Sequence, residues 1–249
     1  MDATLRRLSV FTCVHLWLTI EIMEKRRFEF LSLSLLLGLA AAIGTLIFFG
    51  WLTDEVLEGD SRQFDEATRA AVHQLASPAL TMIMRGFSFV GSTLALAVLT
   101  TLVIVQLALR KLGREAKLFA ITMIGAALLN MTLKLTFKRA RPVPFFDLTP
   151  PETYSFPSGH SLTSAVFFGA LAAIWTARIK SKRTRVIVWI VCTSMFLLIG
   201  FSRIYLGVHH TTDVIAGFAA ALIWILVVRF VEMELARRKR RKQAADLHG

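Results

Sequence analysis

Basic side chains, two histidines and a carboxylate stand at the ends of long uncharged runs in the C-terminal half of the sequence. Lys134 and Arg141 follow one such run, His160 precedes the next, and His209 and Asp213 precede the last. If these run ends converge on one side of the molecule, the cations would hold an anion and the histidines would react with it. Together the residue types suit the transfer of a phosphoryl group.

The cations and their neighbours predict a phosphate-binding site. The guanidinium groups of Arg141 and Arg203 match phosphate oxygens two at a time, and Lys134 adds a further charge. Ser158 contributes a hydroxyl, and the amide of Gly159 would point at the same anion from a helix N-terminus. Any one of these cations alone is best explained as a side chain facing lipid headgroups. The set, repeated at four run ends, favours an anion site.

The histidines supply the reactive groups. His209 and Asp213 are four residues apart, so on a helix the carboxylate accepts from the imidazole Nδ1 and leaves Nε2 free to attack. His160, on another segment, is placed to protonate a leaving oxygen. His210, three residues from Asp213, is a rival for the nucleophile, and spacing leaves both open. A metal site is disfavoured because there is no second carboxylate nearby and the surrounding cations would repel a divalent ion, so no cofactor is expected.

Six uncharged apolar runs must position these residues. The chain of 249 residues is 55% hydrophobic and 18% charged, with a mean hydropathy of +0.60, well outside the range of ordinary soluble domains. A helix that crosses a bilayer needs about 20 apolar residues. We predict an all-α protein, a bundle of six transmembrane helices. The runs are Phe30–Thr53, Gly86–Leu109, Leu118–Leu133, Ser161–Ala177, Val186–Ser202 and Val214–Val228.

The distribution of charge predicts the topology. The formal net charge of +12 would suggest nucleic acid as a partner, but the basic residues lie in segments between the apolar runs, and the alternate segments are acidic or mixed. This is the positive-inside pattern. We therefore expect no nucleic-acid partner, a multi-pass protein of the cell (inner) membrane with both termini in the cytoplasm, and an active site on the external face.

The chain is expected to form one membrane domain, 28–235. It is preceded by a cytoplasmic or interfacial segment, 1–27, with Met23 as a candidate start, and followed by a basic cytoplasmic tail, 236–249. In the first external segment, 54–85, apolar residues at helical spacing predict an interfacial helix, and Ser77 and Pro78 predict the N-cap and first residue of another. No sequence feature predicts an oligomeric state.

Three motifs in this order resemble the signature of the type 2 phosphatidic acid phosphatase superfamily, in its bacterial membrane-bound branch. They are Lys134-x6-Arg141-Pro142, then Pro157-Ser158-Gly159-His160, then Ser202-Arg203-x5-His209-x3-Asp213. The resemblance implies that His209 attacks phosphorus and forms a phosphohistidine, that Asp213 orients it, and that His160 protonates the leaving group and then activates water. It implies that Lys134, Arg141, Ser158, Gly159 and Arg203 hold the phosphate without a metal. The resemblance, and not the spacing, favours His209 over His210.

The expected function is therefore that of a lipid phosphate phosphatase whose substrate stays in the bilayer. Phosphatidic acid, phosphatidylglycerophosphate and undecaprenyl diphosphate are the candidate substrates. Phe145 and Phe146, close to Arg141, are expected either to line the substrate's approach or to pack at the interface. Two alternatives remain, a vanadate-dependent haloperoxidase-like enzyme and a non-catalytic phospholipid carrier. The six predicted spans count against the first, and the intact histidine–aspartate set counts against the second.

Overall fold

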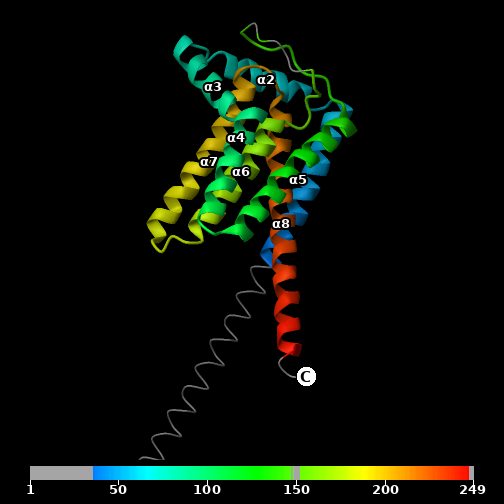
Figure 1. Cartoon of the computed structure of the whole chain (residues 1–249). Helices are drawn as coiled ribbons and strands as arrows, with labels where there is room; N and C mark the ends of the chain where they lie inside the picture. The colour runs from blue at the N-terminus through cyan, green and yellow to red at the C-terminus, as the bar shows by residue number, and fades with distance from the viewer. Residues whose placement is uncertain (1–35, 147, 149–151, 247–249) are drawn as a thin grey trace, which may run out of the picture. The chain divides into compact units, whose positions relative to one another are not determined.

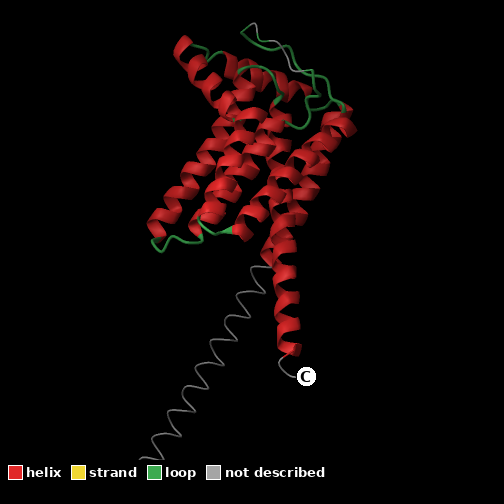
Figure 2. Ribbon diagram, viewed as in Figure 1, coloured by secondary structure: helices red, strands yellow, loops and turns green. Residues whose placement is uncertain are grey.

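The structure, a computed structural model, describes residues 36–146, 148 and 152–246. The predicted N-terminal segment 1–27, including Met23, lies outside these residues. The chain divides into a unit that ends at Gly44 and a unit that runs from Thr45 to Gly249, and the second unit holds all three motifs. All regular structure within the described residues is helical, in agreement with the predicted all-α class (Figure 2).

The helices follow one another with short connections, except between α5 and α6. An N-terminal helix spans Leu36–Glu58. The helices labelled in Figure 1 are α2 (Arg62–His73), α3 (Pro78–Val90), α4 (Thr93–Leu109), α5 (Gly113–Phe137), α6 (Gly159–Thr176), α7 (Lys182–Tyr205) and α8 (Thr211–Asp246). The long segment between α5 and α6 carries Arg141, Pro142, Pro157 and Ser158, while the first motif begins at Lys134 in α5 and the second ends at His160 in α6.

Among the described residues, four helices are long and apolar enough to cross a membrane: Leu36–Glu58, α5, α7, and α8 over Thr211–Lys239. Helices α3 and α4 together make a fifth candidate, bent by 55° at their junction. The protein is thus a multi-pass membrane protein. Helix α6 occupies the remaining predicted run but is not among these candidates, so the count of six spans stays a prediction.

Serine side chains set the starts of the helices that carry the site. Ser77, Ser92 and Ser158 each have extended backbone and accept a hydrogen bond from the backbone N–H three residues later. This N-cap satisfies a donor that a helix leaves free at its first turn. Pro78 occupies the first position of α3, as the Ser77-Pro78 pair predicts. The start of α6 at Gly159 fixes where His160 lies relative to the other helices.

Helix α6 is the centre of the bundle and contacts α4, α5, α7 and α8 (Figure 1). Its side chains Leu162 and Val166 are fully buried, and Phe167 packs edge-to-face on Phe119 of α5, with ring centroids 5.6 Å apart. Side chains on the outer faces are instead apolar and exposed. Examples from α4, α5 and α7 are Leu94 at 74%, Leu128 at 61% and Ile190 at 59%. Such continuous apolar exposure is what lipid tails would cover.

A small residue allows α8 to approach α6 closely. A Cβ at Gly217 would lie 2.7 Å from the carbonyl oxygen of Ser158 and 2.9 Å from the Cβ of Ser161. Only glycine fits such an approach without displacing the backbone. The contact is reinforced by the N–H of Ser158, which donates to the carbonyl oxygen of Asp213 at 2.9 Å. The second and third motifs are thereby joined through their backbones.

Candidate active site

One end of the helical bundle brings together residues from all three motifs. Lys134 and Arg203 lie in the last turns of α5 and α7, and His160 lies in the first turn of α6. Arg141 follows α5, and His209 lies in the turn before α8. All five line one cavity of about 680 Å³, which we call the main cavity. Four helix ends thus contribute to a single pocket.

The other three predicted site residues occupy different positions. Gly159 lines the main cavity, so its backbone is accessible from it. Ser158 is fully buried, and its Oγ caps α6 by accepting from the N–H of Ser161 at 3.4 Å and from the Oγ of Ser161 at 3.0 Å. Asp213 is also fully buried and lies behind His209. Ser158 and Asp213 therefore act on the cavity only through their neighbours.

The hydrogen bonds of His209 define its tautomer. Nη1 of Arg141 lies 3.1 Å from Nε2, and because a guanidinium can only donate, Nε2 must be the acceptor. The ring proton is then on Nδ1, which donates to Oδ2 of Asp213 at 3.2 Å. Burial, opposed by the attraction of Asp213, lowers the pKa of His209 to about 3. The imidazole is therefore neutral at physiological pH, with its lone pair on the cavity side.

His209 is not part of a helix, although its spacing from Asp213 predicts a shared helical face. It lies in the turn between Gly207, which has a φ of +71°, and the start of α8 at Thr211. The carboxylate of Asp213 reaches back to this turn and also accepts from the backbone N–H of His210 at 2.9 Å. The predicted Nδ1 contact thus forms through an N-terminal capping geometry rather than through helical stacking.

Asp213 is held from several directions at once. Its Oδ2 accepts a short hydrogen bond from the Oγ of Ser155, and its Oδ1 accepts from Nη1 of Arg139 at 2.7 Å. With the contacts to His209 and His210, both carboxylate oxygens are engaged. A buried carboxylate with this many donors is fixed in both position and charge.

A second buried carboxylate, Asp65 of α2, lies behind the first. Arg139 bridges the two, because its Nη2 donates to Oδ2 of Asp65 at 2.8 Å while Nη1 serves Asp213. Asp65 also accepts from the backbone N–H and the Oγ of Thr212, at 2.9 and 2.8 Å. Helix α2, predicted to be only interfacial, therefore anchors the start of α8.

The sequence did not assign a role to Asp65 or Arg139. Arg139 stands among the basic residues of the first motif without being one of its signature positions, and Asp65 lies more than 140 residues before Asp213. A usable signal existed on α2. Asp65 shares a helical face with Thr68 and with the partly buried Val72, whereas the apolar Phe64 is half exposed. An acid on the buried face of an amphipathic helix needs a buried cationic partner.

The three cations are anchored to different degrees. Arg141 is fixed by the carbonyl oxygens of Thr153 at 2.6 Å and Val208 at 3.0 Å, and Lys134 donates to the carbonyl oxygen of Tyr154. Burial lowers the pKa of the Arg141 guanidinium, which still remains charged at neutral pH. Arg203 makes one short hydrogen bond to the Oγ of Ser88, and its buried Nε has no partner among the described residues.

The remaining histidines differ in where their rings lie. His160 lines the main cavity and forms no hydrogen bond with any described residue. The ring of His210 is not among the residues lining that cavity, and its Nδ1 lies 4.0 Å from Oδ2 of Asp65. Burial lowers the pKa of His210 as well. Of the two adjacent histidines, only His209 presents a ring nitrogen to the cavity.

The phenylalanines near Arg141 pack away from the cavity. Phe145 stacks on His73 of α2 with ring centroids 4.0 Å apart, and Phe146 stacks on Tyr205 of α7 at 5.5 Å. Neither lines the main cavity, whose apolar lining includes Met131 and Leu135 of α5. Of the two expectations for this pair, the structure supports interfacial packing.

Comparison with known proteins shows which family the chain resembles. The sequence profile of the PAP2 superfamily matches residues 115–235. Over these residues the chain is similar to the PAP2 superfamily. The match covers all three motifs and confirms the family that they resemble.

Two curated PAP2 relatives and one solved structure are similar to this chain. Phosphatidylglycerophosphatase B of Bacillus subtilis is 28% identical over 197 residues, which cover 78% of this chain and 96% of the relative. Undecaprenyl-diphosphatase of Sulfolobus acidocaldarius is 32% identical over 124 residues, 48% of this chain and 54% of the relative. A crystal structure of a transmembrane PAP2-type phosphatidylglycerolphosphate phosphatase from Bacillus subtilis has a TM-score of 0.71, with 28% identity, and covers 78% of this chain and 96% of that one. The predicted enzyme class, a phosphatase, is thereby confirmed.

Proposed function

We propose that this protein removes a phosphate group from a membrane lipid, with His209 as the nucleophile that attacks phosphorus. The observation that carries the proposal is the orientation of the His209 ring, with Nδ1–H on Asp213 and the Nε2 lone pair on the cavity side beside Arg141. A protein that only carried a phospholipid would need the cations but no histidine held in this tautomer.

The substrate phosphate binds between Lys134, Arg141, Arg203 and the backbone of Gly159. When the substrate binds, a phosphate oxygen replaces His209 Nε2 as the acceptor of the hydrogen bond from Arg141 Nη1. The lone pair on Nε2 is then free to attack phosphorus. The other hydrogen bonds of Arg141, to Thr153 and Val208, hold the guanidinium in place during this exchange. The cations neutralise the phosphate oxygens and stabilise the charge of the five-coordinate transition state.

The reaction then proceeds in two displacements. Nε2 of His209 forms a bond to phosphorus while the bond from phosphorus to the leaving oxygen breaks. His160, which takes up a proton when the negatively charged phosphate binds beside it, gives that proton to the leaving oxygen. In the second displacement, water attacks the phosphohistidine, His160 accepts the proton of the water, and the phosphorus–nitrogen bond breaks. Inorganic phosphate leaves, and both histidines return to their starting states.

Asp213 stabilises the positive charge that the His209 ring acquires when Nε2 is phosphorylated. The Nδ1 proton stays on the ring and its hydrogen bond to Oδ2 strengthens, as in other histidine–carboxylate pairs. Arg139 and Ser155 keep the carboxylate in position throughout. The cations that surround the phosphate also support metal independence, since they do the work of a divalent ion and would repel one.

A lipid substrate is supported by the apolar surface around the main cavity. Met131 and Leu135, both more than half exposed, lie on the lipid-facing side of α5 next to Lys134. The main cavity thus borders a surface that lipid tails would cover. Phosphatidic acid, phosphatidylglycerophosphate and undecaprenyl diphosphate remain the candidates, and the last two correspond to the names of matched relatives.

The proposed topology has six spans, with α6 as the sixth, both termini in the cytoplasm, and the site on the external face of the cell membrane. Support comes from the connections at the end of the bundle opposite to the site. The α4–α5 connection carries Arg110 and Lys111, and the α6–α7 connection carries Arg178 and Lys180. Basic residues concentrate on the cytoplasmic side of membrane proteins.

The test is phosphate release by the purified full-length protein from the three candidate lipids in detergent micelles, with and without EDTA. We expect turnover of at least one lipid, unchanged by EDTA, and a labelled phosphohistidine when the reaction is quenched in alkali. Vanadate is expected to inhibit, because it adopts the geometry of five-coordinate phosphorus. Loss of turnover in EDTA that magnesium restores would overturn metal independence. No release from any of the three lipids by the folded protein would overturn the proposed function.

A further inference from the structure

A second cavity adjoins the main one, and its lining does not include His209. Its volume is about 310 Å³, and it shares Ser92, His160 and Arg203 with the main cavity. We call it the side cavity. His209 lines the main cavity only, whereas Arg85 of α3 lines the side cavity only. His160 and Arg203 thus stand at the boundary between the two.

The geometry of phosphoryl transfer indicates which parts of the substrate lie on the two sides of this boundary. In an in-line displacement, the attacking atom and the leaving oxygen lie on opposite sides of phosphorus. If His209 attacks from the main cavity and His160 protonates the leaving oxygen, the leaving group must extend past His160, away from His209. The side cavity, which is lined by His160 but not by His209, offers such a space.

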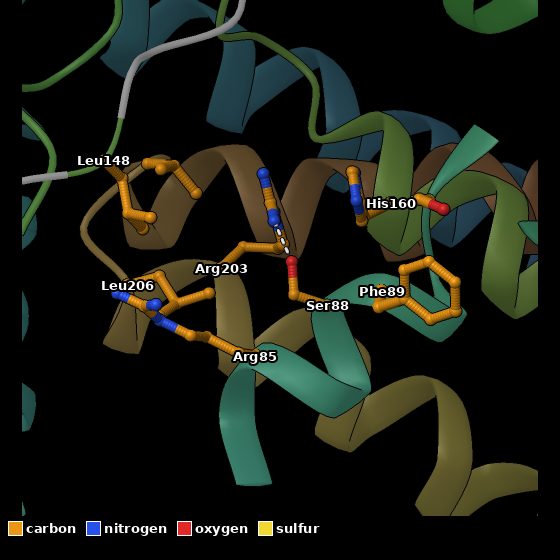
Figure 3. Close-up of a pocket in the computed structure, with 9 residues that line it drawn as sticks. Arg85, Ser88, Phe89, Leu148, His160, Arg203 and Leu206 are labelled. Atoms are coloured by element: carbon orange, nitrogen blue, oxygen red, sulfur yellow. Dashed lines mark hydrogen bonds between the residues drawn. The ribbon is translucent and has the colours of Figure 1, made fainter. Parts of the chain in front are cut away.

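The polar lining of the side cavity is cationic. Figure 3 shows Arg85, Arg203 and Ser88 around it, and none of the described lining residues is acidic. The exposed Arg85 has no hydrogen bond or ion pair with a described residue. The 7% exposed Arg203 has a buried Nε without a partner. A cavity with two guanidinium groups and no carboxylate favours an anion.

The remaining lining suits the lipid portion that follows this anion. Leu148 and Leu206 contribute apolar surface, and Phe89, which is 70% exposed, lies at the outer edge of α3. A leaving group with a charged group close to the scissile bond and an apolar chain beyond it would match this order of surfaces.

We propose that the side cavity is the leaving-group subsite, and that Arg85 is a specificity-determining residue that favours leaving groups carrying their own phosphate. For a lipid diphosphate, the terminal phosphorus is attacked by His209 in the main cavity. The inner phosphate, which stays on the lipid, lies in the side cavity against Arg85 and Arg203. For a lipid monophosphate, the leaving group is an uncharged alcohol and Arg85 gains no partner. This inference rests on the proposed function.

The experiment compares two substrates that share one tail, farnesyl diphosphate and farnesyl monophosphate, with phosphate release as the readout. The ratio of their kcat/KM values reports recognition of the inner phosphate, because the tail contributes equally to both. In R85Q we expect this ratio to fall about tenfold, the effect of losing one charge-assisted hydrogen bond. R85K, which keeps the charge but not the planar fork, is expected to restore part of the ratio.

The matched control is R110Q, since Arg110 is an exposed arginine that follows the C-terminal end of α4 and lines neither cavity. It is expected to leave the ratio at the wild-type value. Equal losses on both substrates in R85Q would mean that Arg85 attracts anionic lipids in general, and an unchanged ratio would mean that the inner phosphate lies elsewhere. Either result overturns the inference while leaving the proposed function intact. If the wild-type protein releases phosphate from neither these substrates nor the three candidate lipids, the proposed function itself fails.

Discussion

The two histidines proposed for catalysis lie in different kinds of surroundings. The ring of His209 is 1% exposed and has a partner at each nitrogen, Arg141 at Nε2 and Asp213 at Nδ1. Behind it, Asp213 is held by Ser155 and Arg139. His160 has no hydrogen bond with a described residue and borders two cavities. The hydrogen bonds on the His209 side of the site are thus formed before substrate binds, whereas the His160 ring still lacks partners.

The difference reflects the task of each side. A nucleophile gains from being fixed in one tautomer and one direction, because each degree of freedom removed beforehand lowers the entropic part of the barrier. A residue that protonates the leaving group must instead remain free to form its hydrogen bond with the leaving oxygen of the substrate. We infer that rigidity is concentrated around His209, and that the substrate supplies the missing contacts around His160 and Arg203.

The largest effect is expected from removing the nucleophile. His209→Gln places an amide where the imidazole stood and cannot form a phosphohistidine. We expect turnover to fall about 10⁴-fold or more, together with loss of the trapped intermediate. The measurement is phosphate release combined with alkaline quenching of radiolabelled substrate.

The matched control replaces the adjacent histidine. His210 presents no ring nitrogen to the main cavity, so H210Q is expected to retain most of the turnover and the trapped intermediate. Thermal unfolding in detergent has to show that both variants are folded. An inactive H210Q beside an active H209Q would reverse the nucleophile assignment.

An intermediate effect is expected from the residues behind the nucleophile. Asp65→Asn keeps the shape of the side chain but removes the charge that pairs with Arg139. Because Arg139 then binds Asp213 alone, we expect kcat to fall about 10–100-fold, typical of supporting residues around a reactive group, with a smaller change in KM. The pH dependence of kcat should also move, since Asp213 would stabilise the charged imidazole differently.

A second acid on the same helix serves as the control for this variant. Glu66 is exposed, and E66Q is expected to keep wild-type kcat and pH dependence. Full activity of D65N, or a loss of activity that matches its loss of thermal stability, would mean that Asp65 only fastens α2 to the bundle. Helix α2 would then have a structural role and no influence on the chemistry.

The sequence predicted the helical class and the convergence of charged helix ends because these depend on local information. Apolar runs define the helices, and costly charges at their ends identify a site. The Ser77-Pro78 start of α3 and the Ser158 cap of α6 are likewise readable from adjacent residues. The bend between α3 and α4 was not predicted, since Gly91 and Ser92 interrupt the run without adding a charge.

The rest of the site depends on contacts between distant parts of the chain. No local pattern pairs Asp65 with Arg139, or states that the turn before α8 places His209 over the capping carboxylate of Asp213. Such assignments need the packing of α6 against α8, which the Gly217 contact makes possible.

The last effect is expected in stability against acid and not in turnover, and it tests how well the nucleophile side excludes water. The pKa of His209 is lowered by burial to about 3, from an ordinary value of 6.5. Between these values the unfolded chain binds a proton that the folded protein does not, so the free energy of unfolding decreases as the pH falls from 6.5 towards 3. The contribution is on the order of 3 kcal/mol at pH 4.

H209Q lacks this group, so its Tm in detergent should drop less than that of the wild-type protein between pH 7 and pH 4. Equal drops in the two proteins would mean that the His209 ring takes up a proton in the folded state with ease. His209 would then not be shielded from water, and the contrast between a closed nucleophile side and an open leaving-group side would be wrong.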